Sequence, residues 1–217
     1  MFKKYAFVFV LLLFISCSRT MLVSVPPAVD LLSHGNIGLI TFAAENAKGE
    51  LDEMATQRFL QSVTQSQRGV QLIELGPLEG VLSKANQSTL ATLDQNSLKA
   101  IGEQFNVDGL FYGKISISNV KPQVSISAIV KSMGVRASFT ISMTSRLYST
   151  STGATLWTDS VRWEESLADL NLSTDGIPLF NVKDKNQTHQ RLIEQMVYQL
   201  TRDFRSNQRR VKVRKQD

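Results

Sequence analysis

The sequence predicts an α/β (α+β) protein, with a single mixed β-sheet packed against helices and an amphipathic helix near its C-terminal end. Three observations support this fold class. Residues 124–163 form the clearest β region, and residues 135–144 within it alternate apolar and polar side chains with a period of two, as half-buried strands do. Residues 188–205 repeat apolar side chains every three or four positions, as one face of a helix does. A strand, a helix and a second strand open the folded region.

The opening unit begins with a short apolar run, NIGLITF over residues 36–42, which predicts a buried strand. A helix over 52–65 follows, because apolar side chains recur at every fourth position from Leu51 to Val63. Residues 70–75, VQLIEL, predict the second strand. The pattern leaves open whether these two strands are adjacent and parallel or are split by a later strand.

The next region is less regular at first. Residues 78–94 are ambiguous and predict one or two helical turns at most. Residues 95–106 predict a better helix, with Asn96 or Ser97 as its N-terminal cap. Residues 108–120, DGLFYGKISISNV, predict a strand.

The clearest strand pattern follows, in predicted strands and turns that alternate along the chain. The strands are expected over 124–130, 135–149 and 154–162, and the turns over 121–122, 132–134 and 150–153. Gly153 is placed to supply a positive φ in the last turn. Residues 169–187 are polar and irregular. The final helix is expected over 188–205, with Thr188 as its cap and Arg202 and Arg205 near the negative end of its dipole.

The N-terminus has the pattern of a secretory signal. Lys3 and Lys4 are followed by an uncharged apolar run over residues 6–15, and then by the small residue Ser16. A transmembrane helix needs about 20 apolar residues. The run is shorter, so we expect a signal that is cleaved rather than a spanning anchor.

Cys17 is the only cysteine of the chain and follows this signal directly. The stretch FISC resembles the lipobox of bacterial lipoproteins, with Phe14 where that motif has Leu. The resemblance implies that Cys17 receives a diacylglyceryl group and, after cleavage, a fatty acyl chain such as palmitate. Ser18, in place of Asp, implies sorting to the outer membrane. The alternative is an ordinary signal followed by a coincidental cysteine.

These features divide the chain into four expected segments. They are a signal peptide over 1–16, a lipidated cysteine and tether over 17–35, an α/β domain over 36–206, and a basic tail over 207–217. The end of the chain carries an excess of positive charge, in Arg202, Arg205, Arg209, Arg210, Lys212, Arg214 and Lys215. This tail is expected either to contact an anionic surface or to be a solvated, frayed helix end.

Motifs for enzymatic chemistry are lacking in the sequence. His34 and His189 are far apart, and no His/Cys cluster has the spacing of metal ligands. The nucleophile elbow, the Walker A motif and the dinucleotide-binding glycine motif are also missing. Glu164 and Glu165 are adjacent on a predicted strand, so they point to opposite faces and share no substrate well. We therefore expect no enzyme, no catalytic residue, no cofactor and no metal site.

Several segments together resemble the TolB-N-terminal-like α/β domain of envelope lipoproteins. They are NIGLITF with the helix after it, VQLIELG, FNVDGLFYGKI and RLYSTSTGATLWTDS. The resemblance includes the curli-secretion channel lipoproteins and the outer-membrane lipoprotein activators of penicillin-binding proteins. It implies a non-enzymatic protein at the outer membrane, facing the periplasm. Gly109, Gly113 and Gly153 have a structural interpretation, because glycines relax turns or allow close backbone approach. Trp157 is expected to be an apolar anchor against the last helix.

Two functions remain open at this point. The first is a membrane-anchored adaptor or regulator in envelope biogenesis, whose protein partner is a peptidoglycan synthase or a secretion or assembly complex. The second is an oligomeric secretion channel that uses the 124–149 hairpin as a membrane hairpin. A half-solvated sheet gives the same alternation as a membrane hairpin, and we favour it. Nucleic acid is not an expected partner of an exported protein.

Overall fold

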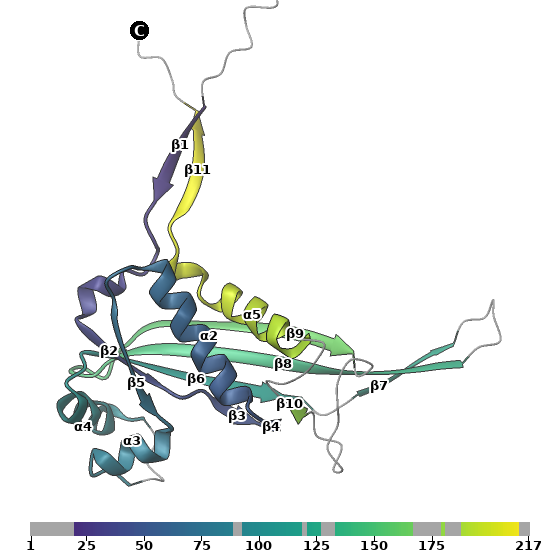
Figure 1. Ribbon diagram of the computed structural model, residues 1–217, viewed down its shortest axis with the longest axis horizontal. Coiled ribbons are helices and arrows are strands. Elements are labelled where there is room, and N and C mark those ends of the chain that lie inside the picture. Colours follow the sequence, from purple (N-terminus) through teal and green to yellow (C-terminus); the bar gives the residue numbers. More distant parts are fainter. Residues whose placement is uncertain are drawn as a thin grey trace, which may run out of the picture. The chain divides into compact units, whose positions relative to one another are not determined.

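The computed structural model describes residues 20–88, 93–118, 121–126, 133–166, 179–180 and 188–212. Contacts divide the chain into two units. One is Ala28–Arg205, and the other joins the two ends of the chain, with described residues 20–27 and 206–212. The expected fold class, a mixed sheet packed against helices with an amphipathic C-terminal helix, is confirmed in the larger unit (Figure 1).

The larger unit holds most of the elements. In chain order they are η1 Leu31–His34, β2 Asn36–Ile40, β3 Ala43–Glu45, β4 Lys48–Gly49, α2 Leu51–Ser66, β5 Gln71–Gly76, α3 Leu78–Lys84, α4 Gln95–Phe105, β6 Gly109–Ile117, β7 Lys121–Ile126, β8 Met133–Ser149, β9 Thr155–Ser166, β10 Leu179–Phe180, α5 Thr188–Leu200 and η3 Arg202–Phe204. The smaller unit holds β1 Thr20–Val25 and β11 Asn207–Lys212.

Seven strands form the main sheet, in the order β5-β2-β6-β8-β7, with β3 beside β6 and β9 beside β8. Strand β2 pairs in parallel with both β5 and β6, so the opening strand–helix–strand unit is parallel and unsplit. Strand β8 pairs antiparallel with β6, β7 and β9. A second, two-stranded pairing joins β4 to β10 in parallel.

Helices α2 and α5 lie side by side on one face of this sheet (Figure 1). The apolar stripe that predicted α2 is buried, with Leu51, Ala55, Phe59 and Val63 all in the main core cluster. Every second residue of β8 from Phe139 to Leu147 is also buried, while residues between them are half-buried or exposed. The half-solvated sheet is therefore confirmed for this part of β8.

The opposite face of the sheet is covered in part by α3 and α4. Leu82, Ile101 and Leu110 belong to a second core cluster there. Farther along β8 and β9 this face is polar, and Arg146, Ser160 and Arg162 are exposed. Among the described side chains, the sheet thus has one face that is mostly packed under α2 and α5 and one that is partly solvated.

Some predicted boundaries need correction. Helix α4 is capped by Asp94, whose carboxylate accepts a hydrogen bond from the Ser97 N–H at 2.8 Å, so the prediction of Asn96 or Ser97 as cap was wrong. Lys121 and Pro122 begin β7 rather than forming a turn. Strand β7 lies at the edge of its pairing with β8, where a proline needs no ladder partner for a missing N–H.

Two further predictions were closer. The last helix ends at Leu200 rather than at 205 and continues as the short η3. The chain tightens there because the Arg205 N–H bonds to the Arg202 carbonyl three residues earlier, not four. Gly153 has a φ of 72° between β8 and β9, as predicted for that hairpin. Met133 and Gly134, predicted as part of a turn, instead begin β8 and pair with Ile126 and Ser125. Ser132, the first residue of that predicted turn, and all of 169–187 except Leu179–Phe180 lie outside the described residues.

The smaller unit is a two-stranded antiparallel ribbon formed by β1 and β11. Thr20 pairs with Lys212 and Val25 pairs with Asn207. We expected an irregular tether and a basic tail in these segments. The sequence does not reveal the ribbon because each strand depends on a partner from the other end of the chain, and no local pattern records that pairing.

Candidate interaction groove

A groove of about 640 Å³ runs along α2 and α5 on the helical face of the sheet. Successive turns of both helices contribute outward-facing side chains to it, and β9 contributes one side chain. The residues that line it are Arg58, Gln61, Ser62, Gln65, Trp163, Glu194, Gln195, Val197, Tyr198 and Gln199. We call this surface the α2–α5 groove.

Polar contacts cross from one helix to the other in the groove. The Arg58 guanidinium lies 2.9 Å from the Glu194 carboxylate. The hydroxyls of Ser62 and Thr201 are 2.6 Å apart. The ion pair is partly exposed, and such pairs contribute about 0–1 kcal/mol. The helices are therefore held together mainly by the core beneath them, and the polar contacts fix their relative register.

The chemistry of the groove suits binding. Its four glutamines each carry an amide that both donates and accepts hydrogen bonds. Tyr198 is 64% exposed, which is high for an aromatic side chain, and Trp163 is half-buried. Tyr, Trp and Arg are the residues enriched at protein interfaces, because they combine a large contact area with a polar group.

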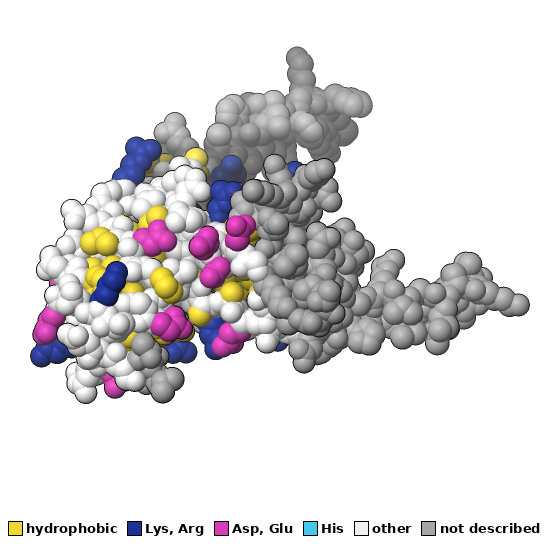
Figure 2. Space-filling model, turned by 60° about the horizontal axis from the view of Figure 1, so that its bottom comes forward, with side chains coloured by type: hydrophobic (Ala, Val, Ile, Leu, Met, Phe, Trp, Pro, Cys, Tyr) yellow, Lys and Arg dark blue, Asp and Glu magenta, His cyan; other side chains and the backbone are white. Residues whose placement is uncertain are grey.

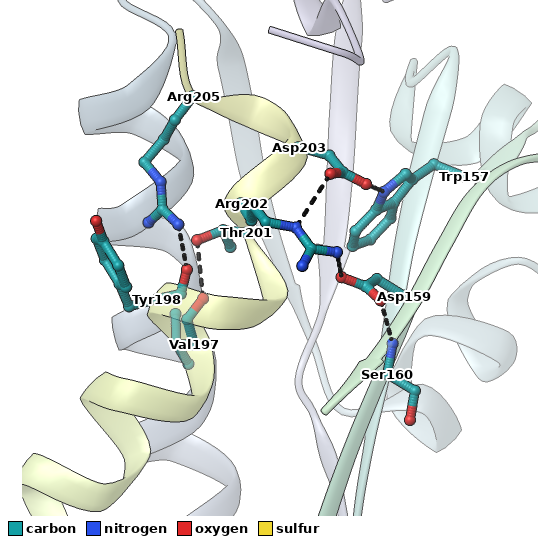
Figure 3. A network of polar contacts seen from close by, with 9 residues as sticks. All are labelled: Trp157, Asp159, Ser160, Val197, Tyr198, Thr201, Arg202, Asp203 and Arg205. Carbon is teal, nitrogen blue, oxygen red and sulfur yellow. Dashed lines mark hydrogen bonds and ion pairs between the residues drawn. The ribbon is translucent and has the colours of Figure 1, made fainter. Parts of the chain in front are cut away.

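Tyr198, which lines the groove, is contacted by Arg205, the residue that follows η3 (Figure 3). The Arg205 guanidinium lies 3.6 Å from the centroid of the Tyr198 ring, in cation–π contact, and also donates a hydrogen bond to the Tyr198 carbonyl. These two contacts hold the tyrosine ring at the surface in one orientation. An aromatic side chain held in this way loses less conformational entropy when a partner binds.

A second set of contacts ties the same turn to β9. The Trp157 indole N–H donates to the Asp203 carboxylate at 3.2 Å, and Arg202 lies 3.5 Å from Asp203 and 3.6 Å from Asp159 (Figure 3). The Trp157 ring packs 4.6 Å from Phe204, between centroids. Trp157 is thus the apolar anchor that the sequence predicted, and it packs on η3 rather than on the helix itself.

The polar face of the sheet offers a different surface. The Lys114 ammonium lies 2.7 Å from the Glu45 carboxylate, and this contact raises the pKa of Lys114. The Arg146 guanidinium donates to the Tyr148 hydroxyl at 3.4 Å, which raises the pKa of Arg146. Figure 2 shows one face of the molecule, on which several acidic side chains gather near the middle, basic side chains lie mostly toward the edges, and hydrophobic side chains form small groups.

Cys17, the one site residue that the sequence predicted, lies outside the described residues. Within the described ranges, no three His, Cys, Asp or Glu side chains lie close enough together to hold a metal ion. No helix in those ranges is both long and apolar enough to cross a membrane. The groove was missed by sequence reasoning. Its one usable signal is Tyr198, an aromatic residue placed outside the apolar stripe of α5.

No protein-family model and no curated protein matches the sequence. Solved structures with a similar fold include the PelC dodecamer from Paraburkholderia phytofirmans, at 7% identity and a TM-score of 0.45, over 87% of this chain and 99% of that one. They also include the LpoB C-terminal domain from Salmonella enterica, at 14% identity and a TM-score of 0.39, over 60% and 83%. A third is lipoprotein GNA1162 from Neisseria meningitidis, at 16% identity and a TM-score of 0.35, over 63% and 87%.

One of these structures is a lipoprotein, the class of protein that the N-terminal signal and Cys17 predict. At these identities and TM-scores the likeness carries no argument about function.

Proposed function

We propose that the protein is a non-enzymatic lipoprotein, anchored through Cys17, that acts as an adaptor or regulator in envelope biogenesis through protein–protein contacts. One observation carries this proposal, namely a lone cysteine placed directly behind a charged and then apolar signal. Ser18, where an Asp would favour retention, supports an outer-membrane location with the folded domain in the periplasm.

The α2–α5 groove supports the adaptor role because it presents an oriented aromatic ring among neutral amides. Hot spots of protein interfaces are enriched in Tyr, Trp and Arg, and the groove holds one of each. The partner we propose is an envelope protein, either a peptidoglycan synthase or a subunit of a secretion or assembly complex.

The anchor is tested by acyl labelling in cells. Wild-type protein is expected to incorporate labelled palmitate and to fractionate with membranes, whereas Cys17→Ser is expected to incorporate none. Ser18→Ala is the matched control and keeps the label. Because the uncleaved signal can hold Cys17→Ser at a membrane, the label is the deciding readout. Palmitate on Cys17→Ser would show that the cysteine is not the attachment site.

The groove is tested by gentle affinity capture of the tagged full chain from envelopes, with quantitative mass spectrometry. Tyr198→Ala and Gln199→Arg are expected to lose the co-purifying partner. Gln104→Arg, on the exposed side of α4, makes the same change of charge away from the groove and is expected to keep it. Equal capture by all the variants would remove the groove from the proposal while leaving the anchor intact.

The secretion channel stays as a second candidate because β7 and the first part of β8 extend beyond β9 (Figure 1). Lys121–Ile126 pairs with Met133–Ser138, and the pairing with β9 begins only at Ser138. The described part of each paired segment has six residues, and a membrane strand has about 9–11.

The channel is tested by shortening this projection without touching the core. Residues 123–136 are replaced by Asn-Gly, which joins the facing residues Pro122 and Ala137 by a tight turn. Deleting all of 124–149 would instead remove buried residues of β8. A channel predicts a large homomeric ring in the wild type and loss of ion conductance in the shortened variant. An adaptor predicts that the shortened variant still captures its partner.

A further inference from the structure

The β1–β11 ribbon has two chemically different faces. Directly paired residues share a face, so Met21 with Val211 and Val23 with Arg209 lie together on one side. Val25 lies on the same side, and the four apolar side chains Met21, Val23, Val25 and Val211 are each between 40% and 60% exposed. The ribbon therefore presents an uncovered apolar strip.

Positive charge lies beside this strip. Arg209 is on the apolar face itself, and Arg210 is on the other face, opposite Leu22. Both arginines are exposed, and neither β1 nor the described part of β11 carries an acidic residue. An apolar strip edged by arginines matches the boundary between acyl chains and anionic head groups.

The position of the ribbon in the chain also indicates that a membrane surface covers the apolar strip. Cys17 precedes Thr20 by three residues, and three extended residues span about 10 Å. An acyl chain on Cys17 therefore holds Thr20, the first residue of β1, within that distance of the membrane surface. A two-stranded ribbon is marginally stable in water by itself, so a surface that covers one face also stabilises the pairing.

We infer that the β1–β11 ribbon is a membrane-surface element, which seats Met21, Val23, Val25 and Val211 at the acyl boundary and places Arg209 and Arg210 against the phosphates of anionic phospholipids. The ribbon then adds a second attachment to the lipid of Cys17, from the opposite end of the chain. The acyl chains on Cys17 anchor the protein, and the ribbon adds binding through its buried apolar area and its basic residues.

The test uses residues 18–217, the predicted mature chain without Cys17, because an acyl chain would hold every variant on the membrane. Co-sedimentation is measured with vesicles of phosphatidylglycerol and phosphatidylethanolamine, and with phosphatidylcholine vesicles. The wild type is expected to bind the anionic vesicles more strongly. Part of that binding should persist at about 1 M salt, where the Debye length is about 3 Å.

Two variants separate the two contributions. Arg209→Glu with Arg210→Glu is expected to lose at least about fivefold in affinity per arginine at low salt. Val23→Thr, Val25→Thr and Val211→Thr together keep shape and strand propensity and are expected to lose the binding that persists at high salt. Lys84→Glu with Lys99→Glu, at exposed sites on α3 and α4, is the control of equal charge and is expected to lose much less.

Ribbon integrity is followed by amide hydrogen exchange of residues 20–25 and 207–212. Three outcomes would overturn the inference. In the first, the wild type does not bind anionic vesicles. In the second, all three variants bind these vesicles to the same extent. In the third, the variants change the sedimenting mass of the protein in solution but not its binding to vesicles. The last outcome would mean that the ribbon pairs with a second copy of the chain. None of these outcomes touches the acyl label on Cys17, so the anchor is judged separately.

Discussion

Ser145 lies on the packed face of β8, opposite Gly113 of β6, and is fully buried. Its hydroxyl is the one side-chain polar atom among the described buried residues without a hydrogen-bond partner. A buried polar group without a partner costs about 1–3 kcal/mol, so Ser145→Ala is expected to raise the free energy of unfolding by about 1 kcal/mol. Urea denaturation followed by tryptophan fluorescence measures this change.

Ser142→Ala is the control for Ser145→Ala, because Ser142 is half-buried on the other face of the same strand. Surface changes of this kind usually stay within about 0.5 kcal/mol. A loss of stability in Ser145→Ala would mean that the hydroxyl is bonded in solution, for instance to a buried water.

Gln67 joins three segments at the end of α2. Its side-chain carbonyl accepts from the Leu31 N–H at 2.8 Å, and its amide donates to the carbonyls of Val29 and Phe204, the latter at 3.1 Å. Gln67→Leu keeps the volume but leaves these buried backbone groups without partners. The expected cost is about 3 kcal/mol, and Gln65→Leu, exposed on the same helix, is expected to change little. Parallel urea denaturation curves measure both, and equal curves would contradict the assigned contacts.

At the scale of elements, α4 depends on its cap. Hydrogen bonds from the Ser97 backbone N–H and side chain lower the pKa of Asp94 from its ordinary value of 3.8. Because the folded-state pKa is depressed, the ionised cap stabilises the fold above the unfolded pKa, and this stability is lost as the pH falls through the folded value. Asp94→Ala is therefore expected to lower the Tm at neutral pH, by an amount that shrinks at acid pH.

Asp94→Asn separates the charge of this cap from its hydrogen bond. Asparagine caps helices about as well as aspartate but does not titrate in this range. Its Tm is therefore expected to stay close to wild type at neutral pH and to lack the acid-dependent loss at this site. A Tm difference between wild type and Asp94→Ala that stays constant with pH would contradict the role of the ionised carboxylate. Scanning calorimetry across the acid range measures all three proteins.

The elements that sequence reasoning found are those with a strong local period. Leu51, Ala55, Phe59 and Val63 all became buried as α2, and residues 139–147 of β8 alternate as predicted. Strands β1 and β11 were not predicted because their pairing joins opposite ends of the chain. The α2–α5 groove was not predicted for a similar reason, since it exists only where two helices far apart in sequence come together.

At the scale of the whole molecule, a series of aromatic contacts links α2 and η3 to the sheet. Phe59 contacts Phe111 at 5.1 Å between centroids, and Phe111 contacts Phe204 at 5.7 Å and Trp157 at 6.1 Å. These side chains come from α2, β6, η3 and β9, so the core closes only when the chain has been made as far as η3. The ribbon strand β11 begins after this point.

Two truncations test whether the larger unit is stable without the ribbon and whether the ribbon is needed for vesicle binding. A chain that ends at Ser206 keeps both core clusters and is expected to unfold within about 0.5 kcal/mol of the full chain, while losing vesicle binding. A chain that ends at Thr201 also loses Phe204, which is fully buried, and is expected to lose about 3 kcal/mol or more. Tryptophan fluorescence in urea measures both, since Trp157 packs on Phe204. If both truncations were equally destabilised, the ribbon would be part of the folding unit, and its role at the membrane could not be separated from stability.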